Sequence, residues 1–104
     1  MVIKEILKEF REKIGVLYGD RLKDLILYGS WARGQATADS DIDVVVVLKG
    51  TIKPGEEIDR MIDVITDLNL RHNVLLSVYP VSDQDYSNLN SPILMNIRRE
   101  GLAA

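Results

Sequence analysis

Hydrophobic residues recur three and four positions apart in two long stretches of the chain, with charged residues between them. The first stretch predicts an amphipathic helix that ends near Tyr18-Gly19, where glycine can adopt the left-handed cap conformation; its apolar positions are Ile3, Ile6, Leu7, Phe10, Ile14 and Leu17. The second predicts a helix whose first turns hold the acidic residues Glu56, Glu57 and Asp59, with apolar positions at Ile58, Met61, Ile62, Ile65 and Leu68. Near the C-terminus, Ser91-Pro92 is typical of a helix start and Gly101 of a helix end.

Short apolar runs between these helices predict three strands, at residues 25–28, 42–48 and 74–79. The second run holds four consecutive valines, whose β-branched side chains favour a strand buried on both faces. Residues 30–34 fit a brief helical turn, 35–40 a loop and 50–55 a linker. The connection between the first two strands is too short for an ordinary parallel crossover. The pattern therefore predicts an α/β (α+β) fold, in which helices pack against a small mixed β-sheet of three or more strands.

Composition narrows the class of protein. A chain of 104 residues without a linker or repeat predicts one domain over residues 1–104. A net charge of −3 argues against a protein built for direct nucleic-acid binding. The absence of cysteine removes disulfides and thiolate metal sites. The longest apolar stretch, residues 44–48, is far too short to cross a membrane, so we expect a cytoplasmic protein.

A glycine–serine pair and two alternating aspartates carry the candidate chemistry. Gly29-Ser30 follows the first strand, and Asp41 and Asp43 begin the valine-rich strand after ten intervening residues. Glycine permits a tight turn and close approach of a ligand. Backbone N–H groups and a serine hydroxyl at the start of a helical turn can hold a phosphate. Arg33, about one turn further on, is a weaker candidate for a phosphate or a carboxylate contact.

The two aspartates predict a magnesium site. Side chains at alternate strand positions share a face, so Asp41 and Asp43 point the same way while Ile42 points into the core. Carboxylates this close repel each other, which raises the pKa of one unless a cation lies between them. Mg²⁺ combines one or two carboxylates with phosphates and water. The sequence thus predicts a nucleoside triphosphate bound through Mg²⁺, its α-phosphorus held for in-line attack.

The order of these motifs resembles that of the DNA polymerase β-type nucleotidyltransferase superfamily, and more narrowly of its minimal nucleotidyltransferase (MNT) proteins. The resemblance is carried by Gly29-Ser30, Ala32-Arg33-Gly34 and Asp41-Ile42-Asp43 within residues 28–47. It implies the polymerase β-type fold, with Asp41 and Asp43 as catalytic metal ligands and Gly29 and Ser30 around the β- and γ-phosphates. It also implies a HEPN-domain ribonuclease toxin as partner, AMP transfer from ATP to a tyrosine of that toxin, and an antitoxin role for this chain.

One departure from the family pattern leaves alternatives open. The superfamily usually has a third carboxylate on the next strand, and residues 71–79 contain no acidic residue. The nearest candidates by sequence are Asp67 and Asp83. A weak or inactive binding module that neutralises its toxin by complex formation therefore stays an alternative, as does nucleotidyl transfer to RNA or a small molecule.

Several aromatic and basic residues permit more than one interpretation. Trp31 could stack on a base, anchor its turn to the core or face a partner. His72, the only histidine, is more typical of a cap or surface position than of a general base. Tyr79, Tyr86 and residues 93–95 exceed what so small a core needs, which indicates a partner surface or a homo-oligomer.

Overall fold

The computed structural model describes residues 3–37, 39–88 and 91–104. Its helices are α1 (Ile3–Tyr18), α2 (Gly29–Ala32), α3 (Pro54–His72), α4 (Asp83–Asn88) and α5 (Pro92–Glu100), with a short 3₁₀ helix η1 at Gly19–Arg21. Its strands are β1 (Leu22–Tyr28), β2 (Ile42–Leu48), β3 (Leu76–Ser82) and β4 (Leu102–Ala103). The predicted element order is therefore confirmed, with α4 and β4 added.

The four strands form one mixed sheet in the order β3-β2-β1-β4. Strand β1 pairs antiparallel with both β2 and β4, whereas β2 and β3 are parallel. The long helix α3 makes the crossover between the parallel strands, as parallel pairs require. This confirms the expected α/β class with a mixed sheet packed by helices.

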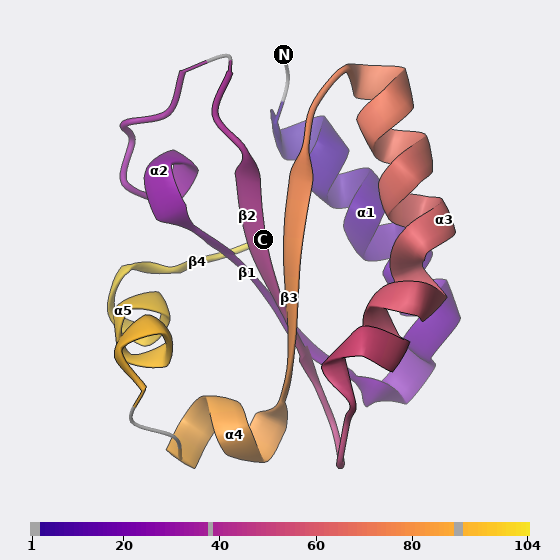
Figure 1. Cartoon of the computed structure of the whole chain (residues 1–104), viewed down its shortest axis with the longest axis vertical. Helices are drawn as coiled ribbons and strands as arrows, with labels where there is room; N and C mark the ends of the chain where they lie inside the picture. Colours follow the sequence, from indigo (N-terminus) through magenta and orange to yellow (C-terminus); the bar gives the residue numbers. More distant parts are fainter. Residues whose placement is uncertain (1–2, 38, 89–90) are drawn as a thin grey trace.

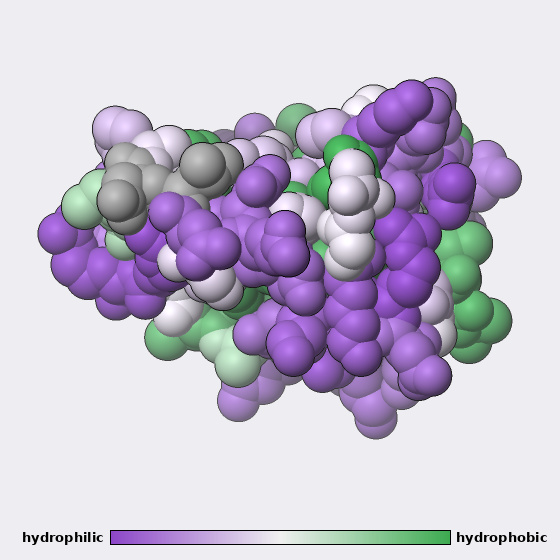
Figure 2. Space-filling model, turned by 90° about the horizontal axis from the view of Figure 1, so that it is seen from below, coloured by the Kyte–Doolittle hydropathy of each residue, from purple (hydrophilic) through white to green (hydrophobic). Residues whose placement is uncertain are grey.

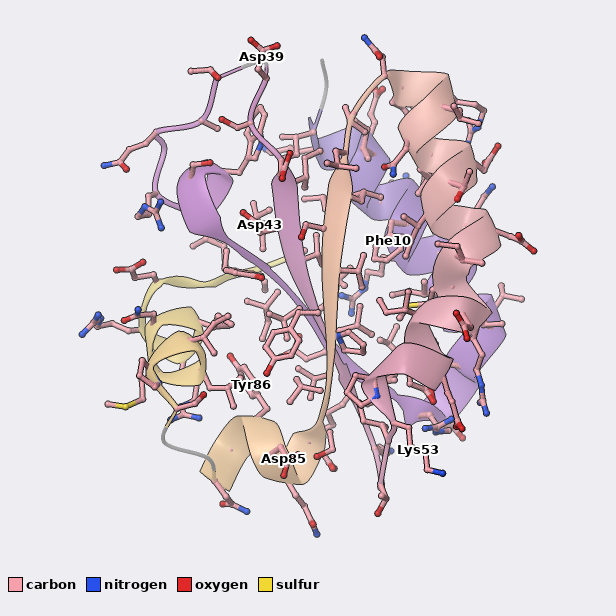
Figure 3. The ribbon with its side chains drawn as sticks, in the orientation of Figure 1. Phe10, Asp39, Asp43, Lys53, Asp85 and Tyr86 are labelled. Atoms are coloured by element: carbon pink, nitrogen blue, oxygen red, sulfur yellow. The ribbon has the colours of Figure 1, made fainter. Side chains whose placement is uncertain are left out.

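Each face of the sheet has its own apolar core and its own helices. Helices α1 and α3 cover one face, where Phe10 is fully buried, as Figures 1 and 3 show. Helix α5 packs on the other face, with Leu94 and Ile97 against Val45. The valines of β2 alternate between these two cores, so the strand is buried on both faces as its composition predicts.

Element boundaries differ from the sequence prediction around proline. Strand β3 continues through Pro80 to Ser82 instead of ending before it. Proline is tolerated there because β3 is an edge strand. Helix α3 begins at Pro54, inside the predicted linker, with proline in the first turn where its missing N–H is harmless. At α5, the Ser91 hydroxyl accepts a hydrogen bond from the Leu94 N–H at 3.3 Å, which confirms the predicted cap.

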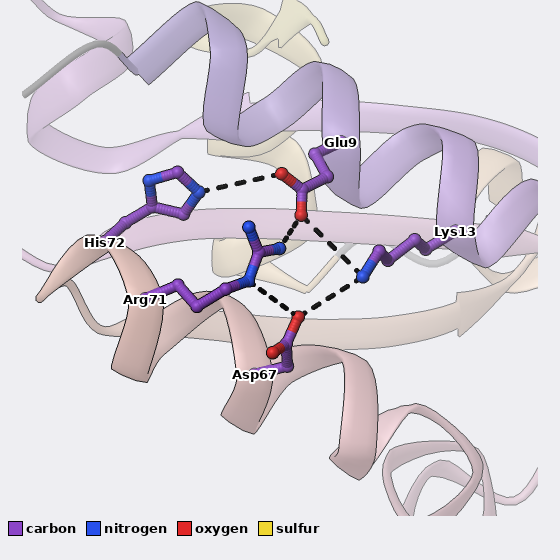
Figure 4. Close-up of polar contacts among 5 residues, drawn as sticks. All are labelled: Glu9, Lys13, Asp67, Arg71 and His72. Atoms are coloured by element: carbon purple, nitrogen blue, oxygen red, sulfur yellow. Dashed lines mark hydrogen bonds and ion pairs between the residues drawn. The ribbon is translucent and has the colours of Figure 1, made fainter.

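A cluster of charged side chains joins α1 to α3 on the outer side of their interface (Figure 4). Glu9 pairs with Arg71, and its carboxylate lies 3.7 Å from both Lys13 Nζ and His72 Nε2. Asp67 completes the cluster, with Oδ2 at 3.2 Å from Lys13 Nζ and 3.0 Å from Arg71 Nε. Glu9 is the shared centre of three of these contacts.

Replacing Glu9 by glutamine should lower the free energy of unfolding by about 1 kcal/mol, because one charge serves several partners in a network. The loss should shrink at high salt, since these side chains are partly exposed to solvent. Urea unfolding at two salt concentrations measures both effects. Glu12→Gln, on the exposed side of the same helix, is the matched control. Equal midpoints for the two variants would contradict a structural role for the cluster.

The surface seen from below in Figure 2 is mostly hydrophilic, with apolar colour only in small separate areas. This end of the molecule carries α4 and the turn between β2 and α3. It therefore presents no broad apolar patch of the kind that marks a protein interface. In the described part of the chain, no helix combines the length and the apolar character needed to span a membrane.

Candidate active site

Gly29 ends β1 and turns the chain into α2 in a conformation that suits glycine. Its φ of +72° lies in the left-handed region. A Cβ atom placed on Gly29 would lie 2.3 Å from Asp43 Oδ2. The absence of a side chain therefore lets the Asp43 carboxylate rest directly against the backbone of the Gly-Ser turn. The two halves of the sequence motif meet at this contact.

Asp41 and Asp43 flank Ile42 at the start of β2, and the predicted alternation is present between Ile42 and Asp43. Ile42 is fully buried in the core under α1 and α3, whereas Asp43 lies on the opposite face (Figure 3). The pKa of Asp43 is raised, first by burial and then by the charge of Asp41, while the Arg33 guanidinium partly offsets the rise. The Asp41 charge thus raises the pKa of Asp43 in the predicted direction, and burial raises it more.

The donor set at this position fits a hard divalent cation. Both side chains offer carboxylate oxygens, and a cation would relieve the repulsion and the burial that raise the pKa of Asp43. Within residues 3–37, 39–88 and 91–104, no cluster of three or more His, Cys, Asp or Glu side chains is arranged to hold a metal ion. Two carboxylates suffice for Mg²⁺ when substrate phosphates and water supply the remaining oxygens.

The strand register identifies which residue stands beside Asp43 on β3. Asp43 pairs with Tyr28 on β1 and with Ser77 on β3, so the three positions form one row across the sheet. Ser77 is exposed and offers a hydroxyl where the family resemblance implies a third carboxylate. The neighbour of Asp43 on β3 therefore carries a hydroxyl and not a carboxylate.

The two sequence candidates for a third carboxylate lie elsewhere. Asp67 is on α3, which covers the opposite face of the sheet, and it is paired with Lys13 and Arg71. Asp83 begins α4, six residues beyond Ser77 and hence about 20 Å away along an extended chain. Neither position can complete the row that contains Asp43. His72 ends α3 beside Glu9, also away from the aspartates.

Helix α2 places Ser30 in its first turn, where backbone N–H groups lack helical partners. Tyr28, the residue before the helix, provides no side-chain cap. Trp31 packs against the larger core, and its Nε1 donates to the Ser40 carbonyl oxygen at 3.4 Å. Of the interpretations of Trp31, the structure supports the anchor, which ties α2 to the loop leading to Asp41.

A pocket of about 370 Å³ opens between Gly29 and Arg33 on one side and α5 on the other. Asn96, Ile97 and Glu100 line the α5 side, and Glu100 Oε2 lies 3.8 Å from Arg33 Nη1. These α5 residues were not among the site residues predicted from the sequence. Their signal is spacing: Ile93, Asn96, Ile97 and Glu100 recur at helical intervals and so share one face.

Comparison with known proteins gives consistent results at the levels of sequence and fold. The family model described as "Nucleotidyltransferase domain" matches residues 3–90. Two proteins of Methanocaldococcus jannaschii bear the name "Putative protein adenylyltransferase". One is 37% identical over 79 residues, covering 74% of this chain and 77% of the relative. The other is 32% identical over 99 residues, covering 94% of this chain and 93% of the relative.

A solved structure shows the same fold at much lower sequence identity. A toxin–antitoxin structure with AMP-PNP superposes with a TM-score of 0.67 at 13% identity, over 98% of this chain and 72% of the other. The family match covers more than half of the chain and includes Gly29, Ser30, Asp41 and Asp43. The chain therefore belongs to the nucleotidyltransferase domain family.

Proposed function

We propose that this chain is a Mg²⁺-dependent adenylyltransferase that moves AMP from ATP to a tyrosine hydroxyl of a cognate HEPN ribonuclease toxin, and thereby acts as its antitoxin. The observation that carries the proposal is the contact between Gly29 and Asp43, which joins a phosphate turn to a carboxylate pair. The whole activity resides in one domain of residues 1–104.

The chain's own residues bind and orient the nucleotide. Gly29 and Ser30 hold the β- and γ-phosphates through backbone N–H groups and the serine hydroxyl. Asp41 and Asp43 would hold Mg²⁺, which when bound would supply positive charge beside the phosphate oxygens. The tyrosine oxygen attacks the α-phosphorus and the bond to the β-phosphate oxygen breaks. Pyrophosphate leaves, and the phenolic proton passes to solvent.

The names of similar proteins support the acceptor and the partner. The relatives from Methanocaldococcus jannaschii are named for adenylyl transfer to protein. The superposed toxin–antitoxin structure was solved with AMP-PNP, an ATP analogue. A tyrosine acceptor and a HEPN-type toxin follow from the resemblance to minimal nucleotidyltransferases, as does ATP as the donor.

The position of the transferred label tests the reaction. The protein is mixed with the product of its neighbouring gene and with ATP labelled on either the α- or the γ-phosphorus. We expect α-label on the partner and no γ-label, since AMP rather than phosphate is transferred. The double variant Asp41→Ala, Asp43→Ala should transfer neither.

Other results would select an alternative. Label that persists in the double variant would exclude catalysis by these aspartates. An unlabelled partner that stays inhibited without ATP would identify a binding module. Label on RNA or on a small molecule, with none on the partner, would replace the protein acceptor.

A further inference from the structure

The pocket between α2 and α5 begins at the phosphate turn and extends away from it along α5. Gly29 forms part of its lining, so a nucleotide whose phosphates contact Gly29 can extend directly into it. The volume of about 370 Å³ lies within the range of about 300–1,000 Å³ typical of small-molecule sites. Helix α5 lies outside residues 3–90, the part matched by the family model.

The lining favours a nucleoside over a further phosphate. The lining includes the apolar residues Ile93 and Ile97 of α5 and the aromatic residue Tyr28 of β1. Glu100 places a carboxylate in the same lining, and a carboxylate repels phosphate. Its pairing with Arg33 leaves the cation near the phosphate turn and the anion near α5.

Asn96 has an amide whose orientation is held in place. Its Oδ1 accepts a hydrogen bond from Arg99 Nη2 at 2.7 Å. Guanidinium groups only donate, so this contact defines which end of the amide is the oxygen. An asparagine amide matches the donor and acceptor that adenine presents at N6 and N7. Guanine presents two acceptors, N7 and O6, on the same edge, so the amide can satisfy only one of them.

Glu100 offers the complementary contact for a sugar. It lies one helical turn beyond Asn96 on the same face of α5, and a carboxylate accepts hydrogen bonds from ribose hydroxyls. We infer that the pocket between α2 and α5 is the nucleoside subsite, in which Asn96 selects adenine and Glu100 binds the ribose. The inference rests on the proposed function, which places the phosphates at Gly29 and Ser30.

Binding measurements with and without the nucleoside test the assignment independently of any acceptor. Calorimetry with Mg²⁺ compares ATP, GTP and inorganic tripolyphosphate, which lacks the nucleoside. Asn96→Ala should weaken ATP binding about tenfold, which is the cost of one bidentate base contact. It should also abolish the preference for ATP over GTP. Its tripolyphosphate affinity should match that of the wild type. Ser30→Ala should weaken both ligands.

A second variant tests the ribose contact. Wild type should bind ATP several-fold more tightly than 2′-deoxyATP, since one hydrogen bond to a charged group is lost. In Glu100→Ala, which removes the acceptor oxygen, this ratio should approach one. Because the ratio compares two ligands with the same phosphates, release of Arg33 from its ion pair does not affect it.

Met95→Ala is the matched control, because Met95 is an exposed neighbour on α5 outside the pocket lining. It should bind every ligand as the wild type does. Unchanged ATP affinity in Asn96→Ala, or equal losses for ATP and tripolyphosphate, would overturn the assignment while leaving the proposed transferase intact. Failure of the wild type to bind ATP at all would instead refute both.

Discussion

Replacing Asp43 by asparagine is expected to reduce AMP transfer about a thousandfold while leaving the melting temperature equal to or above that of the wild type. The loss follows because Asp43 is the carboxylate in contact with the phosphate turn, and a metal ion contributes several kcal/mol of charge stabilisation in a transition state. The rate of AMP transfer and the melting temperature, measured on the same preparation, test the two expectations.

The expected stability follows from the pKa of Asp43, which lies above its ordinary value of 3.8 because of burial and the Asp41 charge. Between the unfolded and the raised folded value, the folded state binds more protons than the unfolded state. Stability therefore falls as the pH rises through that window, and the ionised carboxylate opposes folding at neutral pH. Asparagine carries no charge, so this part of the pH dependence should disappear.

Asp39→Asn provides the control for Asp43→Asn. Asp39 lies on the loop before the strand, exposed and pointing away from the site in Figure 3. The control should keep both its transfer rate and its melting temperature. A large loss of stability in Asp43→Asn would instead assign this aspartate a structural role.

Gly29→Ala should both destabilise the protein and abolish transfer. The φ of +72° costs a residue with a side chain about 1–2 kcal/mol. The added Cβ would also meet Asp43 Oδ2 at 2.3 Å, so the carboxylate or the turn must move. Denaturant unfolding and the rate of AMP transfer in the presence of Mg²⁺ measure the two effects separately.

Gly50→Ala isolates the backbone contribution. Gly50 has a φ of +83°, and a Cβ there would meet nothing within 4 Å. Gly50→Ala should lower the free energy of unfolding by about 1–2 kcal/mol, the conformational cost alone, and should keep the full rate of AMP transfer. The additional loss in Gly29→Ala then measures the clash with Asp43. If both variants lost the same free energy of unfolding and both kept full AMP transfer, the contact between Gly29 and Asp43 would have no role in the reaction.

The fold was largely predictable because its long elements follow simple patterns. Helices α1 and α3 have apolar positions at helical spacing, and four valines define β2. Strand β4 was not predictable, because two residues carry no periodic signal and pair only after β1 is in place. Helix α4 is polar along most of its six residues, so its apolar pattern is equally weak.

The site was predictable where its residues are adjacent in sequence. Ile42 in the core determines that Asp43 faces away, and the glycine before Ser30 indicates the turn. The neighbour of Asp43 on β3 was not predictable, because strand register depends on packing over the whole sheet. The same holds for the α5 wall, which reaches the site only through the path of the chain after β3.

Strand β4 joins helix α5, which lines the pocket, to strand β1, which leads into the site. It follows α5 at Gly101 and pairs with Ile26 and Leu27 of β1, the strand that continues into Gly29. The Ala104 N–H also donates to the Leu25 carbonyl oxygen at 2.8 Å. Helix α5 thus cannot swing outward unless a few edge hydrogen bonds open. The movement would also withdraw Leu94 and Ile97 from the core around Val45, so widening of the pocket becomes a local unfolding event of α5 and β4 together.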